Sequence, residues 1–408
     1  MTSGATDIAA DLVRTVEDQR EEIVDLCAAL VAAPSVNPPG DTREVAGLVA
    51  RALADRGVSS TFERCTPTMP SVIAEIDSGR PGPHLVLNVH MDTMPPGDAS
   101  EWTVPIWELS RERGRLYGLG MGNMKGAVAA MVTASGLLAG HRRDWSGRVT
   151  FTAVSDEVVF GDNGAAFLLR ERPDLLGDGL LCGEGAGFRR LAIGEKGVLW
   201  LELRASGPTG HSSAVERGRS ASARIAEAVL RVDALNGLAG ALPAELTDLA
   251  AGDDISGSLL SANTGTVSAG SFIGQIAAEA SAQVDLRLPP GISAERAERL
   301  VREAVADVES VQVRVLKGWD ANWTAPGGDL ARAWSVASQQ VTGNGPRHAI
   351  RLPASDASRW RRSGVPALCY GPQPTWSAGV DDYAEEDEVL RCAALYALTA
   401  LAFLRTEP

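Results

Sequence analysis

The sequence predicts an α/β protein in which a sheet domain, with helices on both faces, is interrupted by a smaller inserted α+β domain. Short runs rich in Val, Leu and Ile alternate with segments of helical spacing in the first part of the chain, which is typical of a helix-covered sheet. The pattern changes near Gly194 and returns near residue 318. We therefore expect a discontinuous sheet domain over residues 1–195 and 318–408, with the inserted domain over residues 196–317.

The first part of the sheet domain begins with helices. Apolar residues recur at helical spacing over residues 6–33, and a second helix is expected over residues 42–56. Strands and an alanine-rich helix follow: strands 72–76, 85–89 and 149–154, and the helix that begins after Lys125. Because sites in such sheets gather at the carboxyl ends of the strands, we expect polar residues that directly follow a strand to carry the function.

The inserted domain has a different order of elements. The pattern predicts strand, helix, strand, strand, helix and strand, at residues 198–204, 219–235, 265–268, 280–288, 293–308 and 311–315. That order is the split, ferredoxin-like β-α-β-β-α-β unit. A strand at residues 366–370 and a helix after Glu385 then return the chain to the sheet domain.

Composition and charge exclude several classes of function. The 408-residue chain has a net charge of -14, which opposes binding to nucleic acid or to an anionic membrane. Its five cysteines are scattered and form no Cys-x-x-Cys pair, so a reducing cytoplasm fits better than a disulfide framework or a thiolate zinc site. The first residues lack the pattern of a secretory signal, and no apolar run approaches the ~18 residues of a membrane span. We expect a soluble, cytoplasmic protein with neither a nucleic-acid nor a membrane partner.

Four short motifs place polar residues at expected strand ends or in the turns that follow them. They are His90-Met-Asp92, the glycine-rich turn 118–126 with Asn123 and Lys125, Ser155-Asp-Glu157, and Cys182-Gly-Glu184. Their order and spacing resemble the dinuclear-zinc aminoacylase and carboxypeptidase family, which includes acetylornithine deacetylase, succinyl-diaminopimelate desuccinylase and glutamate carboxypeptidase. The resemblance covers nearly the whole chain. It implies a zinc-exopeptidase-like sheet domain with an inserted ferredoxin-like lid and dimerisation domain.

The resemblance implies a dinuclear zinc site, but several of its ligands are replaced in this chain. The first zinc pocket would consist of His90, Asn123 and Glu184, and the second of Asn123, Val158 and Gly379. Zinc binds imidazole, thiolate or carboxylate groups, whereas an asparagine amide is neutral and Val158 and Gly379 supply no donor atom. We therefore expect an empty second pocket and no resident cofactor. The alternative is one weakly bound divalent metal, zinc, at His90, Glu184 and Asn123.

A shifted alignment of the Ser155-Asp-Glu157 motif is a weaker alternative. Glu157 would then be a metal ligand and Asp156 the base. This shift restores neither Asn123 nor Gly379 to a zinc ligand. The acidic residues 381–382 are further possible substitutes for the missing ligands, although the family has acidic residues there that do not bind metal.

The residues that the chain keeps indicate acid–base chemistry. Glu157 matches the family's general base, and it could abstract a proton from carbon or nitrogen without a metal if burial raised its pKa. His90 beside Asp92 keeps the His–carboxylate arrangement that orients the ring and fixes its tautomer. His211 matches the lid histidine that reaches a substrate carbonyl in the partner subunit of a dimer. We expect Glu157, His90, Asp92 and His211 to be the catalytic residues.

A second group of residues is expected to bind substrate. Arg287 matches a lid arginine associated with the substrate carboxylate, and Lys125 belongs to the Met-Lys-Gly turn of the family. We expect Arg287, Lys125, Asn123 and Glu184 to contact the substrate. The family's lid asparagine falls at Gly274, so part of the substrate clamp differs in this chain.

Three functions are compatible with these residues. The first is an enzyme that uses metal-independent acid–base chemistry (cyclisation, acyl transfer, elimination or amide cleavage) on an amino-acid-derived or amide-bearing substrate. The second is a single-metal amidohydrolase or deacylase of N-acyl amino acids or peptides, and the third is a non-catalytic binding homologue. We favour the first, because the general base is kept while zinc ligands are lost. The resemblance also implies a homodimer, since His211 would serve the site of the neighbouring subunit.

Overall fold

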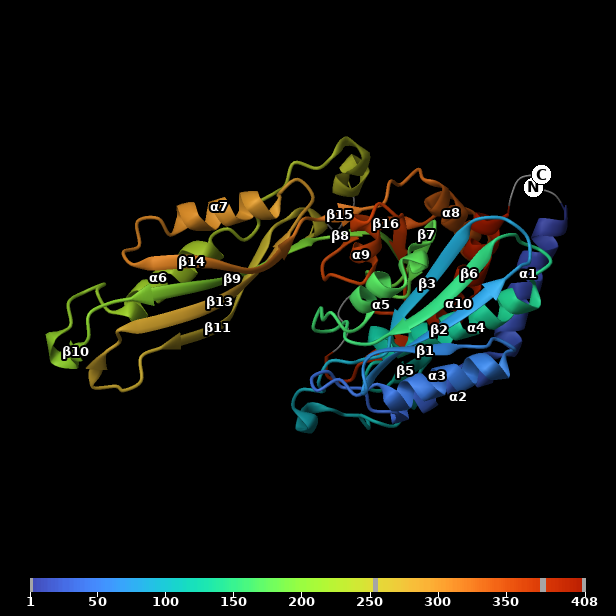
Figure 1. The fold of residues 1–408 in the computed structure, drawn as a ribbon, viewed down its shortest axis with the longest axis horizontal. Helices are drawn as coiled ribbons and strands as arrows, with labels where there is room; N and C mark the ends of the chain where they lie inside the picture. The colour runs from blue at the N-terminus through green and yellow to red at the C-terminus, as the bar shows by residue number, and fades with distance from the viewer. Residues whose placement is uncertain (1–2, 252–255, 375–378, 406–408) are drawn as a thin grey trace. The chain divides into compact units, whose positions relative to one another are not determined.

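A computed structural model describes residues 3–251, 256–374 and 379–405 of the chain (Figure 1). The chain divides into two compact units. The larger, here called the sheet unit, consists of Met1–Gly194, Trp323–Ala349 and Ser355–Pro408; the smaller, the insert unit, consists of Glu195–Asn322 and Ile350–Ala354.

The sheet unit is built around a large mixed sheet. Its strand order is β1-β2-β6-β3-β7-β17-β8-β15, with β16 paired to β8. The strands are β1 (Thr61–Thr66), β2 (Met69–Asp77), β3 (His84–His90), β6 (Arg148–Val154), β7 (Gly179–Cys182), β8 (Arg190–Glu195), β15 (Asn322–Trp323), β16 (Arg347–Arg351) and β17 (Ala367–Cys369). Strand β3 runs parallel to both β6 and β7, and all of its residues are buried. Burial on both faces explains why β3 is a continuous run of Val and Leu between two histidines.

Helices cover both faces of this sheet (Figure 1). One layer contains α1 (Ser3–Asp18), α2 (Arg20–Ala32), α3 (Arg43–Asp55), α4 (Gly126–Gly140), α8 (Asp329–Thr342) and α10 (Glu386–Leu404). In that layer α4 and α10 pack against each other and against β3. On the other face, α5 (Ala165–Glu171) and α9 (Ala357–Arg362) pack Leu168 and Trp360 onto the strands. The helix expected over residues 6–33 is in fact two helices, because the backbone of Gln19 departs from helical geometry.

Smaller elements complete the sheet unit. A short sheet has the order β18-β5-β4, with β4 (Ser110–Glu112), β5 (Arg115–Tyr117) and β18 (Tyr383–Glu385). Single helical turns lie at Ala99–Glu101 and Pro173–Leu176, and a wider, irregular turn lies at Met121–Lys125, where the backbone of Asn123 and Met124 is not helical. None of the helices in the described ranges is long and apolar enough to cross a lipid bilayer.

The insert unit is an antiparallel sheet with two helices. Its strand order is β11-β13-β9-β14, formed by β9 (Gly197–Ser206), β11 (Ser261–Ala269), β13 (Glu279–Leu288) and β14 (Val311–Trp319). Helices α6 (Ala221–Asp233) and α7 (Ala294–Ala304) pack on this sheet and share its apolar core. A short hairpin pairs β10 (Gly210–His211) with β12 (Gln275–Ile276), and further helical turns lie at Ser212–Ala214, Ala244–Ala251 and Ser256–Ser258.

The order of the main elements in the insert unit is β9-α6-β11-β13-α7-β14. This is the β-α-β-β-α-β order that the sequence predicts. The expected fold class, an α/β sheet domain with an inserted α+β domain, is confirmed. The role of the insert as a lid or dimerisation domain stays a prediction.

Candidate functional site

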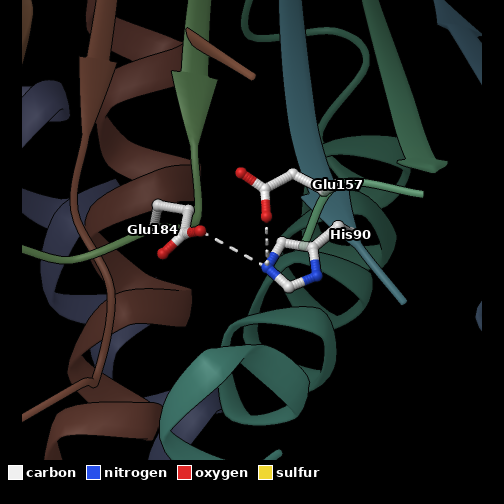
Figure 2. A group of neighbouring side chains, drawn as sticks. All are labelled: His90, Glu157 and Glu184. Carbon is white, nitrogen blue, oxygen red and sulfur yellow. Dashed lines mark ion pairs between the residues drawn. The ribbon is translucent and has the colours of Figure 1, made fainter. Parts of the chain in front are cut away.

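Neighbouring parallel strands bring the expected site residues to one edge of the sheet. His90 is the last residue of β3, Glu157 follows the end of β6, and Glu184 follows the end of β7. Because β3 pairs in parallel with both β6 and β7, their carboxyl ends meet at the same edge. The three side chains point toward one another there (Figure 2).

The imidazole of His90 lies at the centre of this group, here called the His90 cluster (His90, Glu157 and Glu184). His90 Nε2 is 3.3 Å from Glu184 Oε1 and 3.7 Å from Glu157 Oε2. All three side chains are buried, and none of the three residues is more than 6% exposed. Charges in such a dry site interact more strongly than they would in water.

Hydrogen bonding defines the protonation of His90. Its Nδ1 lies 2.9 Å from the backbone oxygen of Asp92, and a carbonyl oxygen can only accept, so Nδ1 carries a proton. Its Nε2 lies 2.9 Å from Oδ1 of Asn123, which is also an acceptor. Both ring nitrogens therefore face oxygen acceptors. With the Asn123 amide in this orientation, the doubly protonated imidazolium or a cation at Nε2 satisfies both contacts; an amide turned over would instead donate its N–H to a neutral Nε2.

The charges around His90 favour the imidazolium. Burial by itself lowers the pKa of His90, but the negative charges of Glu157, Asp92 and Glu184 outweigh it and raise that pKa well above its usual value. For Glu157, burial raises the pKa well above the usual carboxyl range, and the nearby carboxylates of Glu184 and Asp356 add to the rise. The site therefore retains protons at a pH where isolated side chains would release them.

Asp92 holds the backbone that carries Glu157. Its carboxylate accepts hydrogen bonds from the backbone N–H groups of Glu157 and Val158, both at 3.2 Å, and from Asn37 Nδ2 at 2.9 Å. Burial opposes ionisation of Asp92, but its interactions with His90 and Asn37 keep its pKa below the usual value. Asp92 is thus an ionised support for the cluster, with Oδ1 3.5 Å from His90 Nδ1.

The side chain of Asp156 accepts hydrogen bonds from Asn37 and Asn163, not from backbone groups of Glu157 and Val158. Its Oδ1 accepts a bond from Asn37 Nδ2 at 3.1 Å, and its Oδ2 accepts bonds from the backbone N–H and the side-chain amide of Asn163 at 3.1 and 2.8 Å. Its backbone φ of 64° is left-handed, an uncommon conformation for a residue with a side chain. These bonds shape the loop after β6, and they argue against Asp156 as the base of a shifted alignment.

The glycine-rich turn brings Asn123 to His90 but leaves Lys125 inside the protein. Lys125 is 1% exposed and donates from Nζ to the backbone oxygen of Ala33 at 3.1 Å. Burial lowers the pKa of Lys125 to about 7. With almost no exposed surface, Lys125 supports the turn, and its expected contact with substrate stays a prediction.

Two of the three positions expected for a second metal ion, Val158 and Gly379, supply no side-chain donor. Val158 contributes only its backbone N–H, which is bonded to Asp92. A Cβ added at Gly379 would meet no heavy atom of the described chain within 4 Å; the neighbouring residues 375–378 lie outside the described ranges. Asp381 accepts two bonds from Thr103, and Asp382 accepts bonds from the backbone of the glycine-rich turn. These contacts give both aspartates structural roles in place of the substitute-ligand role considered above.

A single divalent ion does fit the His90 cluster. One donor atom from each of His90, Glu157 and Glu184 lies within 4.8 Å of the others. Ligands of a tetrahedral zinc ion are about 3.3 Å apart, close to the separations of His90 Nε2 from Glu184 and Glu157. Oε1 of Glu157 has no hydrogen-bond partner among the described residues, which suits a further ligand. This donor set contains the expected His90 and Glu184 together with Glu157, which was expected as the base. The third expected ligand, Asn123, has its Oδ1 2.9 Å from His90 Nε2.

Residues from three loops complete the site, and the sequence analysis did not single out any of them. Gln373 donates to Glu184 Oε2 at 3.0 Å, and Asn37 bridges Asp92 and Asp156. Burial raises the pKa of Asp356 to about 6, and its Oδ2 has no hydrogen-bond partner in the described ranges. A signal was available for Asn37 and Gln373, since each stands beside prolines in a segment too polar for a core element.

The insert unit carries His211 and Arg287. His211 is exposed, and its Nδ1 accepts the backbone N–H of Ser213 at 3.2 Å, so the proton of the neutral ring lies on Nε2. Arg287, on β13, pairs with Asp285 at 2.8 Å. Gly274 accepts a backbone bond from Ser212 at 3.1 Å, which places the position of the missing lid asparagine beside His211.

Comparison with known proteins connects this site to a family. Residues 86–402 match the model of Peptidase family M20/M25/M40. A succinyl-diaminopimelate desuccinylase from Methylocella silvestris is 26% identical over 400 residues, covering 94% of this chain and 98% of the relative. A probable carboxypeptidase from Paracoccidioides brasiliensis is 30% identical over 281 residues, covering 68% of this chain and 60% of the relative.

Solved structures share the fold. An M20 family metallo-carboxypeptidase, Sso-CP2, from Sulfolobus solfataricus has a TM-score of 0.76 at 17% identity, covering 94% of this chain and 99% of its own. The di-peptidase Dug1p from Saccharomyces cerevisiae has a TM-score of 0.79 at 12% identity, covering 98% of this chain and 99% of its own. These matches confirm the family resemblance drawn from the four motifs. The chain belongs to Peptidase family M20/M25/M40.

Proposed function

We propose that this chain is an enzyme that transforms an amide-bearing, amino-acid-derived substrate by acid–base chemistry at Glu157 and His90, without a pair of metal ions. Its family and its desuccinylase and carboxypeptidase relatives support an enzyme of the peptidase or deacylase type. The proposed reactions are cyclisation, acyl transfer, elimination or amide cleavage.

The observation that carries this proposal is the position of His90 among oxygen acceptors. Both ring nitrogens face oxygen atoms, and Nε2 lies 3.7 Å from the carboxylate of Glu157. The raised pKa of Glu157 makes its carboxylate a stronger base, so the ionised form can accept a proton from the substrate while Nε2–H of the His90 imidazolium donates one to a substrate oxygen or nitrogen. Positioned acid–base groups of this kind contribute roughly 10²- to 10⁴-fold to a rate.

The other residues have supporting roles in this proposal. Asp92 positions His90 and Glu157, whereas Glu184 and Asn123 hold the charge of the imidazolium and contact the substrate. His211 donates Nε2–H to the substrate carbonyl, and Arg287 pairs with a substrate carboxylate. We propose a cytoplasmic homodimer in which residues 196–317 form the lid and dimerisation domain and His211 serves the site of the second copy.

A single-metal amidohydrolase is the second candidate, because the His90 cluster brings three ligand atoms within 4.8 Å of one another. One divalent ion there would polarise the substrate carbonyl as a Lewis acid. Glu157 would then bind the ion, and a proton would no longer be needed on His90 Nε2.

Metal content and activity under chelation distinguish these candidates. The purified chain is assayed for zinc by elemental analysis and tested on N-acyl amino acids and dipeptides, with and without a strong chelator. Glu157→Gln is the test variant, and Glu112→Gln, at an exposed position, is the matched control.

Each outcome selects one reading. Activity that survives chelation, is kept in Glu112→Gln and is lost in Glu157→Gln supports metal-independent chemistry. One zinc per chain, with activity lost to the chelator, selects the single-metal enzyme. Two zinc ions per chain would overturn both, and ligand binding without turnover would identify a non-catalytic homologue.

A further inference from the structure

A cavity in the sheet unit, lined by residues of α8, α10 and the segments around β8, β16 and β17, has no role in the chemistry described above. It has a volume of about 680 Å³, within the range typical of small-molecule sites. Its lining includes Trp334 of α8, Tyr370 after β17, and four arginines: Arg189, Arg190, Arg347 and Arg391. No aspartate or glutamate is among the described residues that line it, and none of the lining residues belongs to the His90 cluster.

The four guanidinium groups form a local concentration of positive charge in a chain whose net charge is -14. Two of them, Arg189 and Arg391, pair with the same oxygen of Glu388, a buried side chain of α10. One carboxylate cannot neutralise two guanidinium groups. The side chain of Arg347 is exposed and forms no hydrogen bond or ion pair within the described ranges, so its donors are available to a ligand.

Two packed aromatic side chains, Trp334 and Tyr370, are part of the lining behind these arginines. The rings of Trp334 and Tyr370 have centroids 4.8 Å apart, and the two residues are 1% and 5% exposed. A low-dielectric wall strengthens the attraction between the arginines and an anion. Guanidinium groups also bind carboxylate and phosphate through paired hydrogen bonds, which favours an anion with defined geometry over a diffuse ion atmosphere.

The cavity shares a loop with the proposed active site. The segment between β7 and β8 carries Glu184 at its start and Arg189 at its end. Tyr370 donates its backbone N–H to the oxygen of Cys182 at 3.0 Å, two residues before Glu184. An anion bound to Arg190, the first residue of β8, would therefore hold one end of the loop whose other end carries Glu184.

We propose that this arginine cavity binds a small organic anion with at least two acidic groups, either a phosphate ester or a di- or tricarboxylate. The ligand bridges Arg347 and Arg190 across the mouth of the cavity, and it orders the loop that carries Glu184. This proposal does not depend on the reaction performed at the His90 cluster.

Binding is measured without any activity assay. Pyrophosphate and citrate are each titrated into the full chain and followed by calorimetry and by melting temperature, because a ligand that binds the folded state raises the melting temperature by mass action. Sodium chloride at matched ionic strength controls for screening. The test variant is Arg347→Gln/Arg190→Gln, and the control is Arg217→Gln, which removes one positive charge from an exposed position of the insert unit, outside the cavity. Circular dichroism checks that each variant is folded.

The expected result is saturable binding of at least one anion, with a dissociation constant below about 1 mM that weakens about tenfold or more in the double variant and is unchanged in Arg217→Gln. Binding of pyrophosphate alone assigns a phosphate ester as the ligand class, and binding of citrate alone assigns a carboxylate. Binding of both shows that the site selects its ligand by charge and not by the type of acidic group. The proposal is overturned if neither anion saturates, if sodium chloride gives the same shift, or if the double variant binds as tightly as the parent. A double variant that fails to fold is replaced by Arg347→Gln alone, for which the same criteria hold.

Discussion

The candidate residues of the sheet unit and those of the insert unit are held in opposite ways. His90, Glu157 and Glu184 are buried, and each lies within 4 Å of another member of the site across strands far apart in sequence. His211 and Arg287 are less buried, and each bonds a residue two positions away in its own chain segment. The first arrangement is fixed by strand register and burial. The second relies on bonds between residues that are close together in the sequence.

Replacement of His90 is expected to have the largest effect on stability and on turnover. His90→Gln leaves Glu157 and Glu184 buried and facing each other without a cation. Removing one partner of a buried charge pair costs about 3–5 kcal/mol. We expect the unfolding free energy to fall by about that amount and the turnover number to fall by roughly 10³-fold or more.

Urea denaturation and steady-state kinetics measure both effects. The control is His141→Gln, a histidine paired with Asp144 at the surface, for which both quantities should stay close to those of the parent. A His90→Gln variant with parental stability and activity would show that the cluster neither holds charge nor performs chemistry.

The second largest effect is expected at Asn37, which connects the support of His90 to the loop of Glu157. Its amide donates to Asp92 at 2.9 Å and to Asp156 at 3.1 Å, and the residue is 4% exposed. Hydrogen bonds to charged groups are each worth about 1.5–3 kcal/mol. Because both bonds come from the same amide nitrogen, their values do not simply add, and Asn37→Ala should lower the unfolding free energy by about 2–4 kcal/mol.

Kinetics should show the same coupling at Asn37. The turnover number should fall about tenfold while KM changes little, because Asn37 is buried and its amide is bonded to Asp92 and Asp156. Asn163→Ala is the matched comparison, since Asn163 donates to Asp156 but not to Asp92. Equal kinetic losses in both variants would mean that loop stability alone is responsible.

The buried site residues of the sheet unit could be predicted in part from the sequence. A strand of consecutive apolar residues that ends in His90, and the motifs that carry Glu157 and Glu184, predict side chains at one sheet edge because parallel register brings strand ends together. Asn37, Asp356 and Gln373 come from loops without periodic pattern, so only the folded chain shows that they meet the site. Lys125 illustrates the converse, since a motif predicts its presence near the turn but not that its ammonium is buried against a backbone carbonyl.

A smaller effect on turnover is expected when the exposed His211 of the insert unit is replaced. His211→Asn removes the Nε2–H donor proposed for the substrate carbonyl, and loss of one such donor costs roughly 10²- to 10³-fold in turnover. Stability should stay within about 0.5 kcal/mol of the parent, because the side chain is exposed. Kinetics with Ser213→Ala separate the role of the ring from that of its neighbour, since this variant keeps the imidazole. Unchanged turnover in His211→Asn would remove His211 from the proposed mechanism.

The smallest effect concerns the two histidines at the ends of β3, His84 and His90, whose pKa values are shifted in opposite directions. Carboxylates raise the pKa of His90, whereas burial and the positive charge of Arg148 lower the pKa of His84 to about 4. Between pH 6.5 and pH 4 the unfolded chain therefore binds a proton at His84 that the folded chain does not, so the His84 contribution to stability is lost as the pH falls through this window.

The full shift of His84 is reduced by solvent near the strand end, which leaves an expected contribution of about 1–2 kcal/mol. In His84→Gln the unfolding free energy should fall less steeply between pH 6.5 and pH 4 than in the parent, by that amount, while the two curves run parallel above pH 7. Urea denaturation across this range measures the difference. Parallel curves throughout would show that His84 titrates normally, and the opposite charge environments of the two ends of β3 would then not extend to its first residue.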